Sequence, residues 1–164
     1  MSGESAAEKP PPWYSDGLAF ECTMCGNCCT GPPGAVWFDD EEGLAMAEAM
    51  GIDVRTFYRR YVRSINGRQS LRERHGRHGF DCVLLDRDSG SCRAGCRVYS
   101  ARPVQCRTWP WWSENLEDRE SWERAKRATP CPGMGQGTVV PLEQITINLR
   151  KSEAASDRCS DPDW

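Results

Sequence analysis

The chain has 164 residues, including 15 glycines, 11 prolines and 10 cysteines, and its mean hydropathy is −0.67. This length fits one domain with a modest core, and the many turn-forming residues predict a loop-rich fold that needs additional stapling. The net charge of −3 provides no general attraction to nucleic acid or to an anionic membrane, and no apolar run is long enough to span a bilayer.

The N-terminal residues 1–16 are small and polar and include three consecutive prolines, so we expect a disordered tail. They contain neither the basic nor the apolar region of a secretory signal, which predicts a cytoplasmic protein. Because cytosolic thiols stay reduced, ten cysteines indicate metal binding or catalysis rather than disulfides. We expect a single cysteine-cluster domain over residues 17–152 and a mobile, polar C-terminal tail over residues 153–164.

The predicted elements of this domain begin with a short strand at residues 36–38. A helix should then start at Asp39 or Asp40, either of which can cap it, and end at Met50, with Gly51 as its stop. Asp53 can cap a second helix. Apolar residues recur in this second helix at helical spacing and predict one buried face, made of Val54, Phe57, Tyr58, Tyr61 and Val62.

Further along the chain, residues 68–86 are expected to form a hairpin, with its better strand at 80–85, and residues 86–95 a loop. A third helix is expected over residues 114–127, with Ser113 as its cap. Pro141 suits either the first turn of a last short helix or the start of a strand. These elements predict a small, irregular α+β domain, stapled by a cysteine-ligated metal centre.

Four cysteines lie within eight residues, in the run C-T-M-C-G-N-C-C, which comprises Cys22, Cys25, Cys28 and Cys29. Cysteines at i, i+3 and i+6 can turn their sulfurs toward one metal centre because each two-residue spacer forms a tight turn. Gly26 can take a positive φ directly after the second of them. Neighbouring side chains of an extended chain point in opposite directions. We therefore expect Cys28 or Cys29 to join the first two cysteines and the other to face a second site or bridge two metals; a strained vicinal disulfide is the alternative.

Six more cysteines follow the run: Cys82, Cys92, Cys96, Cys106, Cys131 and Cys159. The blocks F-E-C-T-M-C-G-N-C-C, D-C-V-L-L-D, C-R-V-Y-S-A-R-P-V-Q-C-R-T-W-P and C-P-G-M-G-Q-G occur in the order found in the YkgJ-type cysteine-cluster family. The chain resembles that family, which is described by its CxxCxxCC motif as zinc- or iron-chelating, over residues 20–137. A similar cysteine pattern in flagellin lysine N-methylases implies iron–sulfur chemistry.

The resemblance implies eight ligand cysteines: Cys22, Cys25, Cys28, Cys29, Cys82, Cys96, Cys106 and Cys131. Cys92 and Cys159 depart from the family pattern, and we expect neither to be a ligand. The eight cysteines could form two four-thiolate sites, one polynuclear site with eight ligands, or one site with spare thiols.

The metal is predicted from the cysteine spacing. Three cysteines spaced C-x2-C-x2-C, with a remote cysteine before a proline, resemble the ligand run of bacterial ferredoxins, although Cys131 is far more remote than the fourth cysteine there. Zinc sites more often pair two C-x2-C turns, whereas Cys92 and Cys96 are spaced C-x3-C. We therefore predict an iron–sulfur cluster of the 4Fe-4S type, with zinc as the alternative.

Charged and aromatic residues lie near the cysteines in sequence. Arg97, Arg102 and Arg107 could offset the negative charge of a thiolate site or be ordinary surface residues. The tryptophans at positions 109, 111 and 112 could shield the centre from water or, as we favour, pack in a core. His75 and His78 have a spacing that permits metal binding, but the surrounding arginines favour an exposed loop.

Eight arginines lie between residues 55 and 77, and Glu73 is the only acid among them. This basic stretch could contact an acidic partner or RNA, although a solvated surface is the interpretation that we favour. No glycine-rich phosphate loop, nucleophile elbow or pair of catalytic carboxylates indicates an enzyme.

Three functions remain open. The first is an iron–sulfur protein with a redox, maturation or catalytic support role. The second is a zinc-stapled binding module whose arginine-rich face meets an acidic partner or RNA, and the third is a metal chelation or delivery protein. We expect a monomer that meets an unidentified protein partner and contacts neither membrane nor nucleic acid.

Overall fold

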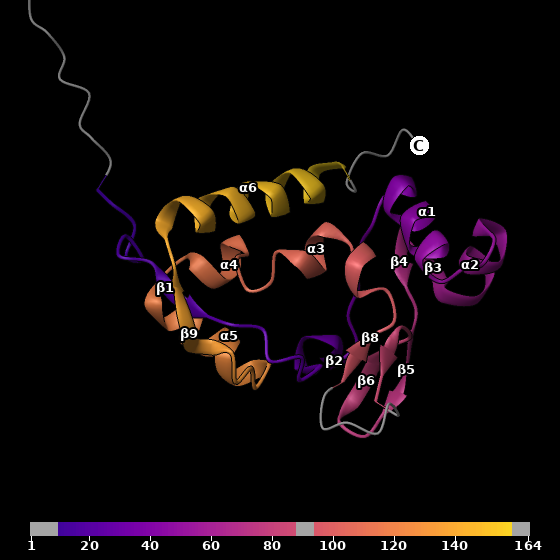
Figure 1. Cartoon of the computed structure of the whole chain (residues 1–164), viewed down its shortest axis with the longest axis horizontal. Helices are drawn as coiled ribbons and strands as arrows, with labels where there is room; N and C mark the ends of the chain where they lie inside the picture. Colours follow the sequence, from indigo (N-terminus) through magenta and orange to yellow (C-terminus); the bar gives the residue numbers. More distant parts are fainter. Residues whose placement is uncertain (1–9, 88–93, 159–164) are drawn as a thin grey trace, which may run out of the picture.

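A computed structural model describes residues 10–87 and 94–158 (Figure 1). Helices and small sheets of two or three strands give the predicted α+β architecture. None of the described helices is both long enough and apolar enough to cross a membrane. Cys92, Cys159, most of the predicted 86–95 loop and the first nine residues lie outside the described part of the chain.

The two predicted N-terminal helices are present. Helix α1 (Asp40–Ala49) is capped by Asp39, whose carboxylate accepts from the Glu42 amide while the Glu42 carboxylate accepts from the Asp39 amide. This reciprocal pair satisfies two amides that the helix itself leaves unbonded. Gly51, with φ of 66°, follows α1 as the predicted stop. Helix α2 (Val54–Tyr61) is capped by Asp53, whose carboxylate accepts from the Thr56 amide.

Short strands follow α2 and pair locally. Strand β3 (Val62–Ile65) pairs antiparallel with β4 (Arg68–Leu71) through a turn in which Asn66 and Gly67 both have positive φ. Strand β5 (Glu73–Gly76) pairs with β6 (Gly79–Cys82), and β2 (Thr30–Gly31) adds to the other edge of β6. The predicted hairpin within residues 68–86 is present as β5 and β6. Its predicted start was wrong, because residues 68–71 belong to an earlier hairpin that the Asn-Gly turn closes.

Two further predictions about this region need correction. The predicted strand at residues 36–38 is only an isolated bridge between Trp37 and Ser70. Val54 is 43% exposed and does not join the buried face of α2, whereas Phe57 is fully buried. Strands β7 (Leu85–Asp86) and β8 (Gly95–Cys96) pair across the ends of the predicted loop.

The elements from α1 to β8 enclose the first of two hydrophobic cores, which we call the first core. Its buried residues are Phe38, Met46, Ala47, Phe57, Val62, Leu71, Leu84 and Val98. The ring of Phe38 packs edge-on against those of Phe57 and Tyr58. The first core therefore rests on apolar side chains that α1, α2 and the hairpins place on one side.

The rest of the chain forms a second group of elements. It contains the single-turn helices η2 (Tyr99–Ala101), α3 (Val104–Arg107) and α4 (Ser113–Leu116), and the longer helices α5 (Arg119–Ala128) and α6 (Leu142–Arg158). The predicted helix over 114–127 is thus broken in two, because Asp118 is extended and caps α5 by accepting from the Ser121 amide. Strand β9 (Met134–Val140) pairs antiparallel with β1 (Leu18–Phe20).

These elements enclose the second core, whose buried residues are Trp111, Leu116, Trp122, Cys131, Met134 and Ile145. The rings of Trp111 and Trp122 stack at 5.6 Å. Figure 1 shows β1, β9, α4 and α5 at one end of the molecule, and α1, α2 and the hairpins at the other. The segment from β1 to β2, which carries the cysteine run, connects the two ends.

Both predicted tails contain folded residues. Trp13 donates from its indole Nε1 to the Leu116 carbonyl at 2.9 Å, and Tyr14 packs beside it on the second core. Helix α6 continues past Ser152 to Arg158. The ordered part of the chain therefore extends beyond residues 17–152 at both ends.

Candidate metal centre

One cavity of about 160 Å³ between the two cores is lined by every cysteine that the structure describes. These are Cys22, Cys25, Cys28, Cys29, Cys82, Cys96, Cys106 and Cys131. They come from five places: the segment between β1 and β2, the end of β6, the end of β8, helix α3, and the loop before β9. The fold thus gathers the eight cysteines that the sequence resemblance selected, although they are separated by more than 100 residues.

The backbone of the cysteine run is bent by two residues with positive φ, Met24 at 53° and Gly26 at 73°. A Cβ on Gly26 would lie 2.5 Å from the Ala94 Cβ, so a larger residue would be excluded by space as well as by conformation. The turn also places the Asn27 amide 3.5 Å from the Cys25 sulfur, to which it donates. The prediction for Gly26 is therefore confirmed.

The adjacent cysteines Cys28 and Cys29 lie in the 3-10 turn η1 (Asn27–Cys29), not in an extended segment. Both line the same cavity, and their sulfurs are 3.9 Å apart. The expectation that one of them faces a second site or bridges two metals assumed an extended backbone, and that assumption was wrong. Two thiolates about 2.3 Å from one tetrahedral metal ion are about 3.8 Å apart, so this pair is spaced as two ligands of one metal would be. The separation excludes a vicinal disulfide.

Burial dominates the electrostatics of the deeper thiols. It raises the pKa of Cys82 to about 11, although the amides of Leu84 and Leu85 partly oppose it. It also raises the pKa of Cys106, and the neighbouring Cys82 sulfur adds to the effect. Thiols in this environment stay protonated at neutral pH until a cation replaces the proton.

Cys28 behaves differently. The hydrogen bond from the Cys29 thiol lowers the pKa of Cys28 to about 7, against the opposing effect of burial, and the Arg102 guanidinium contributes to the lowering. The same hydrogen bond raises the pKa of Cys29. Arg102 lines the cavity and is held over the Tyr99 ring, with its guanidinium carbon 3.8 Å from the ring centroid.

The other residues considered as partners or ligands of the metal centre lie outside the cysteine cavity. Arg97 lies over the Tyr61 ring, and Arg107 is 3.9 Å from the Glu42 carboxylate. His75 and His78 are exposed as predicted and do not line the cavity, although His75 lies in strand β5 instead of a loop. Of the three arginines near the second group of cysteines, only Arg102 lines the cavity.

Two of the three neighbouring tryptophans line the cavity, Trp109 and Trp112, while Trp111 is buried in the second core. The indole N–H of Trp112 donates to the Gln105 carbonyl and the Thr108 hydroxyl. The indole nitrogen of Trp109 is buried and has no hydrogen-bond partner within normal geometry. Burial raises the pKa of Cys131, and the nearby Trp109 indole is one of the groups that partly oppose this rise. A thiolate at Cys131 would give this N–H an acceptor.

The candidate ligands are therefore all cysteine sulfurs. They are spread around the cavity and do not converge on one point. Among the described residues, no three His, Cys, Asp or Glu side chains are arranged to hold a single metal ion. The apolar wall includes Leu84, Leu85 and Val98. These features fit a soft metal centre with thiolate ligands and an extended body, sheltered from water on its apolar side.

Sequence reasoning missed Gln105, which lines the cavity and ties it to the first core. Its side-chain oxygen accepts from the Trp37 amide at 2.8 Å, and its nitrogen donates to the Ala35 carbonyl at 3.1 Å. The side chain thus joins α3 to the segment before α1. Nothing in its sequence context distinguishes it from a surface glutamine.

Comparison with known proteins agrees with this geometry. Residues 21–132 match the family model CxxCxxCC, described as a putative zinc- or iron-chelating domain. The uncharacterized protein MJ0661 of Methanocaldococcus jannaschii is 30% identical over 99 residues, which cover 60% of this chain and 48% of that protein. The chain thus spans about half the length of this relative. No solved structure matches the chain at a significant level. Because the family match covers more than half of the chain and contains all eight cavity cysteines, the chain belongs to the CxxCxxCC family.

Proposed function

We propose that this chain holds an iron–sulfur cluster through cysteine thiolates and serves a redox, maturation or catalytic support role in the reducing cytoplasm. Metal binding as such is supported by the family description. The observation that carries the finer proposal is the arrangement of eight sulfur donors around one cavity of about 160 Å³. Iron–sulfur clusters are held by cysteine thiolates placed around a body of several atoms.

The shape of the donor set favours a cluster over one zinc ion. A tetrahedral zinc site needs four donors at mutual distances of about 3.8 Å. Cys28 and Cys29 meet that spacing, but the described residues offer no third donor arranged with them around one ion. A larger group needs less movement of the surrounding thiols, and it would supply one-electron chemistry when bound.

The residues around the cavity have distinct roles in this proposal. The cavity cysteines are the candidate ligands. Arg102 offsets part of their negative charge, and Trp109 and Trp112 keep water from one side. The amide of Asn27 donates to the sulfur of Cys25, and the unpaired indole N–H of Trp109 lies near enough to Cys131 to serve a thiolate there. Cys22 is exposed, so its edge of the cavity is where a redox partner or a substrate would approach.

A zinc-stapled binding module is the second candidate, and the short distance between the sulfurs of Cys28 and Cys29 favours it. This function would use the arginine-rich stretch between residues 55 and 77, but some of those arginines already have partners within the protein. Arg63 pairs with Glu73 at 2.7 Å, and Arg68 lies over the Trp37 ring. These two arginines are engaged within the protein, which weakens the case for a large basic docking surface.

The proposal is tested by anaerobic purification followed by an absorption spectrum and by iron, zinc and acid-labile sulfide analysis of one sample. We expect broad absorbance at about 400 nm with iron and sulfide in comparable amounts. A colourless protein with stoichiometric zinc and no sulfide would contradict the cluster and make the stapled module the leading account.

A further inference from the structure

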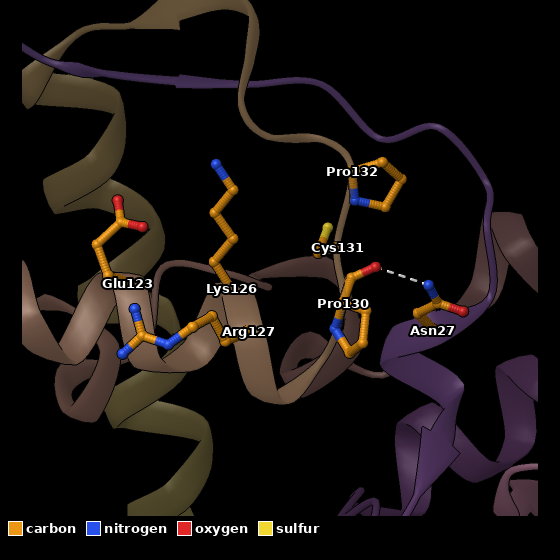
Figure 2. Close-up of a pocket in the computed structure, with 7 residues that line it drawn as sticks. All are labelled: Asn27, Glu123, Lys126, Arg127, Pro130, Cys131 and Pro132. Carbon is orange, nitrogen blue, oxygen red and sulfur yellow. Dashed lines mark hydrogen bonds between the residues drawn. The ribbon is translucent and has the colours of Figure 1, made fainter.

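A second, open pocket of about 400 Å³ lies beside the cysteine cavity (Figure 2). Helix α5 contributes Glu123, Lys126 and Arg127, and the segment after it contributes Pro130, Cys131 and Pro132. Cys131 lines this pocket as well as the cysteine cavity. Cys131 is therefore shared by the candidate metal centre and a surface pocket of a different chemical character.

The pocket carries uncompensated positive charge. Lys126 and Arg127 form no ion pair with any residue in the described ranges 10–87 and 94–158. Glu123 is the only acid among the lining residues, so the lining bears a net charge of +1. Guanidinium and ammonium groups bind carboxylates and phosphates through charge-assisted hydrogen bonds.

The walls of the pocket are held in place by hydrogen bonds. The Asn27 side-chain amide donates to the Pro130 carbonyl at 2.7 Å, which Figure 2 marks with a dashed line. The Cys131 amide donates to the Lys126 carbonyl at 3.3 Å. These bonds tie the cysteine run, the end of α5 and the Cys131 segment together, so the backbone around the pocket is held in place.

We propose that this pocket binds a small anionic molecule through a carboxylate or phosphate group held by Lys126 and Arg127. The volume lies in the range of small-molecule sites, about 300–1,000 Å³. It is much larger than one oxyanion, so the ligand has an organic part, for which the rings of Pro130 and Pro132 provide apolar contact. The competing role for both cations is interaction with the C-terminal carbonyls of α5, which requires no ligand.

If Cys131 ligates the metal centre, as the proposed function requires, the anion lies against a metal ligand. Binding of the anion and loading of the metal are then linked, and each changes the affinity for the other by the same factor.

The test is calorimetric titration of the full-length, metal-loaded protein with inorganic phosphate and, separately, with acetate. We expect saturable binding that weakens as salt is added, and the stronger of the two probes identifies the oxyanion. Lys126→Gln and Arg127→Gln should each weaken binding about tenfold, as expected for loss of one hydrogen bond to a charged group. Arg124→Gln is the matched control, because it removes the same charge from α5 while its guanidinium donates to Ser121 outside the pocket.

Two results would overturn the inference: no saturable binding of either probe, or equal weakening in all three variants, which would show a general charge effect. Metal and sulfide analysis of the same samples keeps the two proposals separate. A wild-type protein without metal contradicts the proposed function but leaves the comparison of variants intact. Repeating the phosphate titration on metal-free protein tests the link through Cys131. A changed affinity supports the link, and an equal affinity contradicts it.

Discussion

The two cores differ in composition and in how they meet the cysteines. The first core is built from aliphatic and phenyl side chains on helices with side-chain caps, and Cys82 and Cys96 pack against its edge. The second is built around stacked tryptophans, and Cys131 is one of its buried members. Each core is smaller than an independent domain normally requires. The cavity cysteines thus come from both cores. A metal bound to them would therefore link two cores that are each too small to be stable alone.

Hydrogen bonds also connect the halves. The Gln105 side chain on α3 bonds to the Trp37 amide and the Ala35 carbonyl. The Val104 amide donates to the Glu42 carboxylate at 2.6 Å, and Arg158 on α6 lies 3.5 Å from the Asp39 carboxylate. The second pair is largely exposed, so it contributes little. We propose that a metal held by the cavity cysteines strengthens this coupling between the cores.

The largest effect should come from removing a ligand of that centre. We expect Cys25→Ser to release the metal and to lower the free energy of unfolding by more than about 4 kcal/mol, because lost metal binding is lost folding free energy. Metal analysis and denaturant unfolding measure both. Full metal retention in Cys25→Ser would contradict the assignment of Cys25 as a metal ligand. Cys159→Ser is the control and should change neither quantity.

Truncating either core tests whether the halves unfold together. Phe57→Ala in the first core and Trp122→Ala in the second should each cost about 3–5 kcal/mol. Scanning calorimetry of the loaded protein should show one transition that both variants lower. In metal-free protein each variant should lower only its own transition. Val54→Ala, at an exposed position, should stay within about 0.5 kcal/mol of wild type. Separate transitions in the loaded protein would disprove the coupling.

A smaller effect sharpens the role of the second core. Trp109→Phe keeps the ring but removes the indole N–H that faces Cys131, so metal affinity should fall about tenfold, as for other groups that support a metal ligand. Competition with a chelator measures it. Trp112→Phe is the matched control, since that N–H bonds to Gln105 and Thr108, and it should leave affinity within about twofold. An equal loss of metal affinity in both variants would contradict the proposed hydrogen bond to Cys131.

The smallest effect concerns pH in the metal-free protein. Burial raises the pKa of Cys82 from 9.0 to about 11. The unfolded chain therefore loses this proton at lower pH than the folded chain, so the contribution of the buried thiol is present below pH 9 and is lost as pH rises toward 11. Thermal melts between pH 8 and pH 11 should show a steeper loss of stability in wild type than in Cys82→Val. Identical slopes would mean that the thiol is not buried in solution.

The features that could be predicted from the sequence are those that depend on neighbouring residues in the chain. Asp39, Asp53 and Gly51 bound helices α1 and α2 as expected, because caps and stops depend on near neighbours. The Asn66-Gly67 turn was a readable signal that the hairpin prediction overlooked. At the site, the family resemblance selected the eight cysteines that share the cavity.

Long-range packing accounts for the remaining errors. Trp13 was assigned to a tail because its partner, the Leu116 carbonyl, is about 100 residues away in the chain. Trp111 turned into the second core while Trp109 and Trp112 turned toward the cysteines, which sequence spacing alone does not distinguish. The helical backbone at Cys28 and Cys29 depends on how the run is clamped to Pro130 by Asn27.

Hydrogen exchange on loaded and metal-free protein tests the central claim most directly. The account predicts that removing the metal raises amide exchange together at residues 82–86, beside the first core, and at residues 131–134, in the second. Unchanged exchange at both segments, or a change confined to one of them, would contradict a metal centre that joins the two halves.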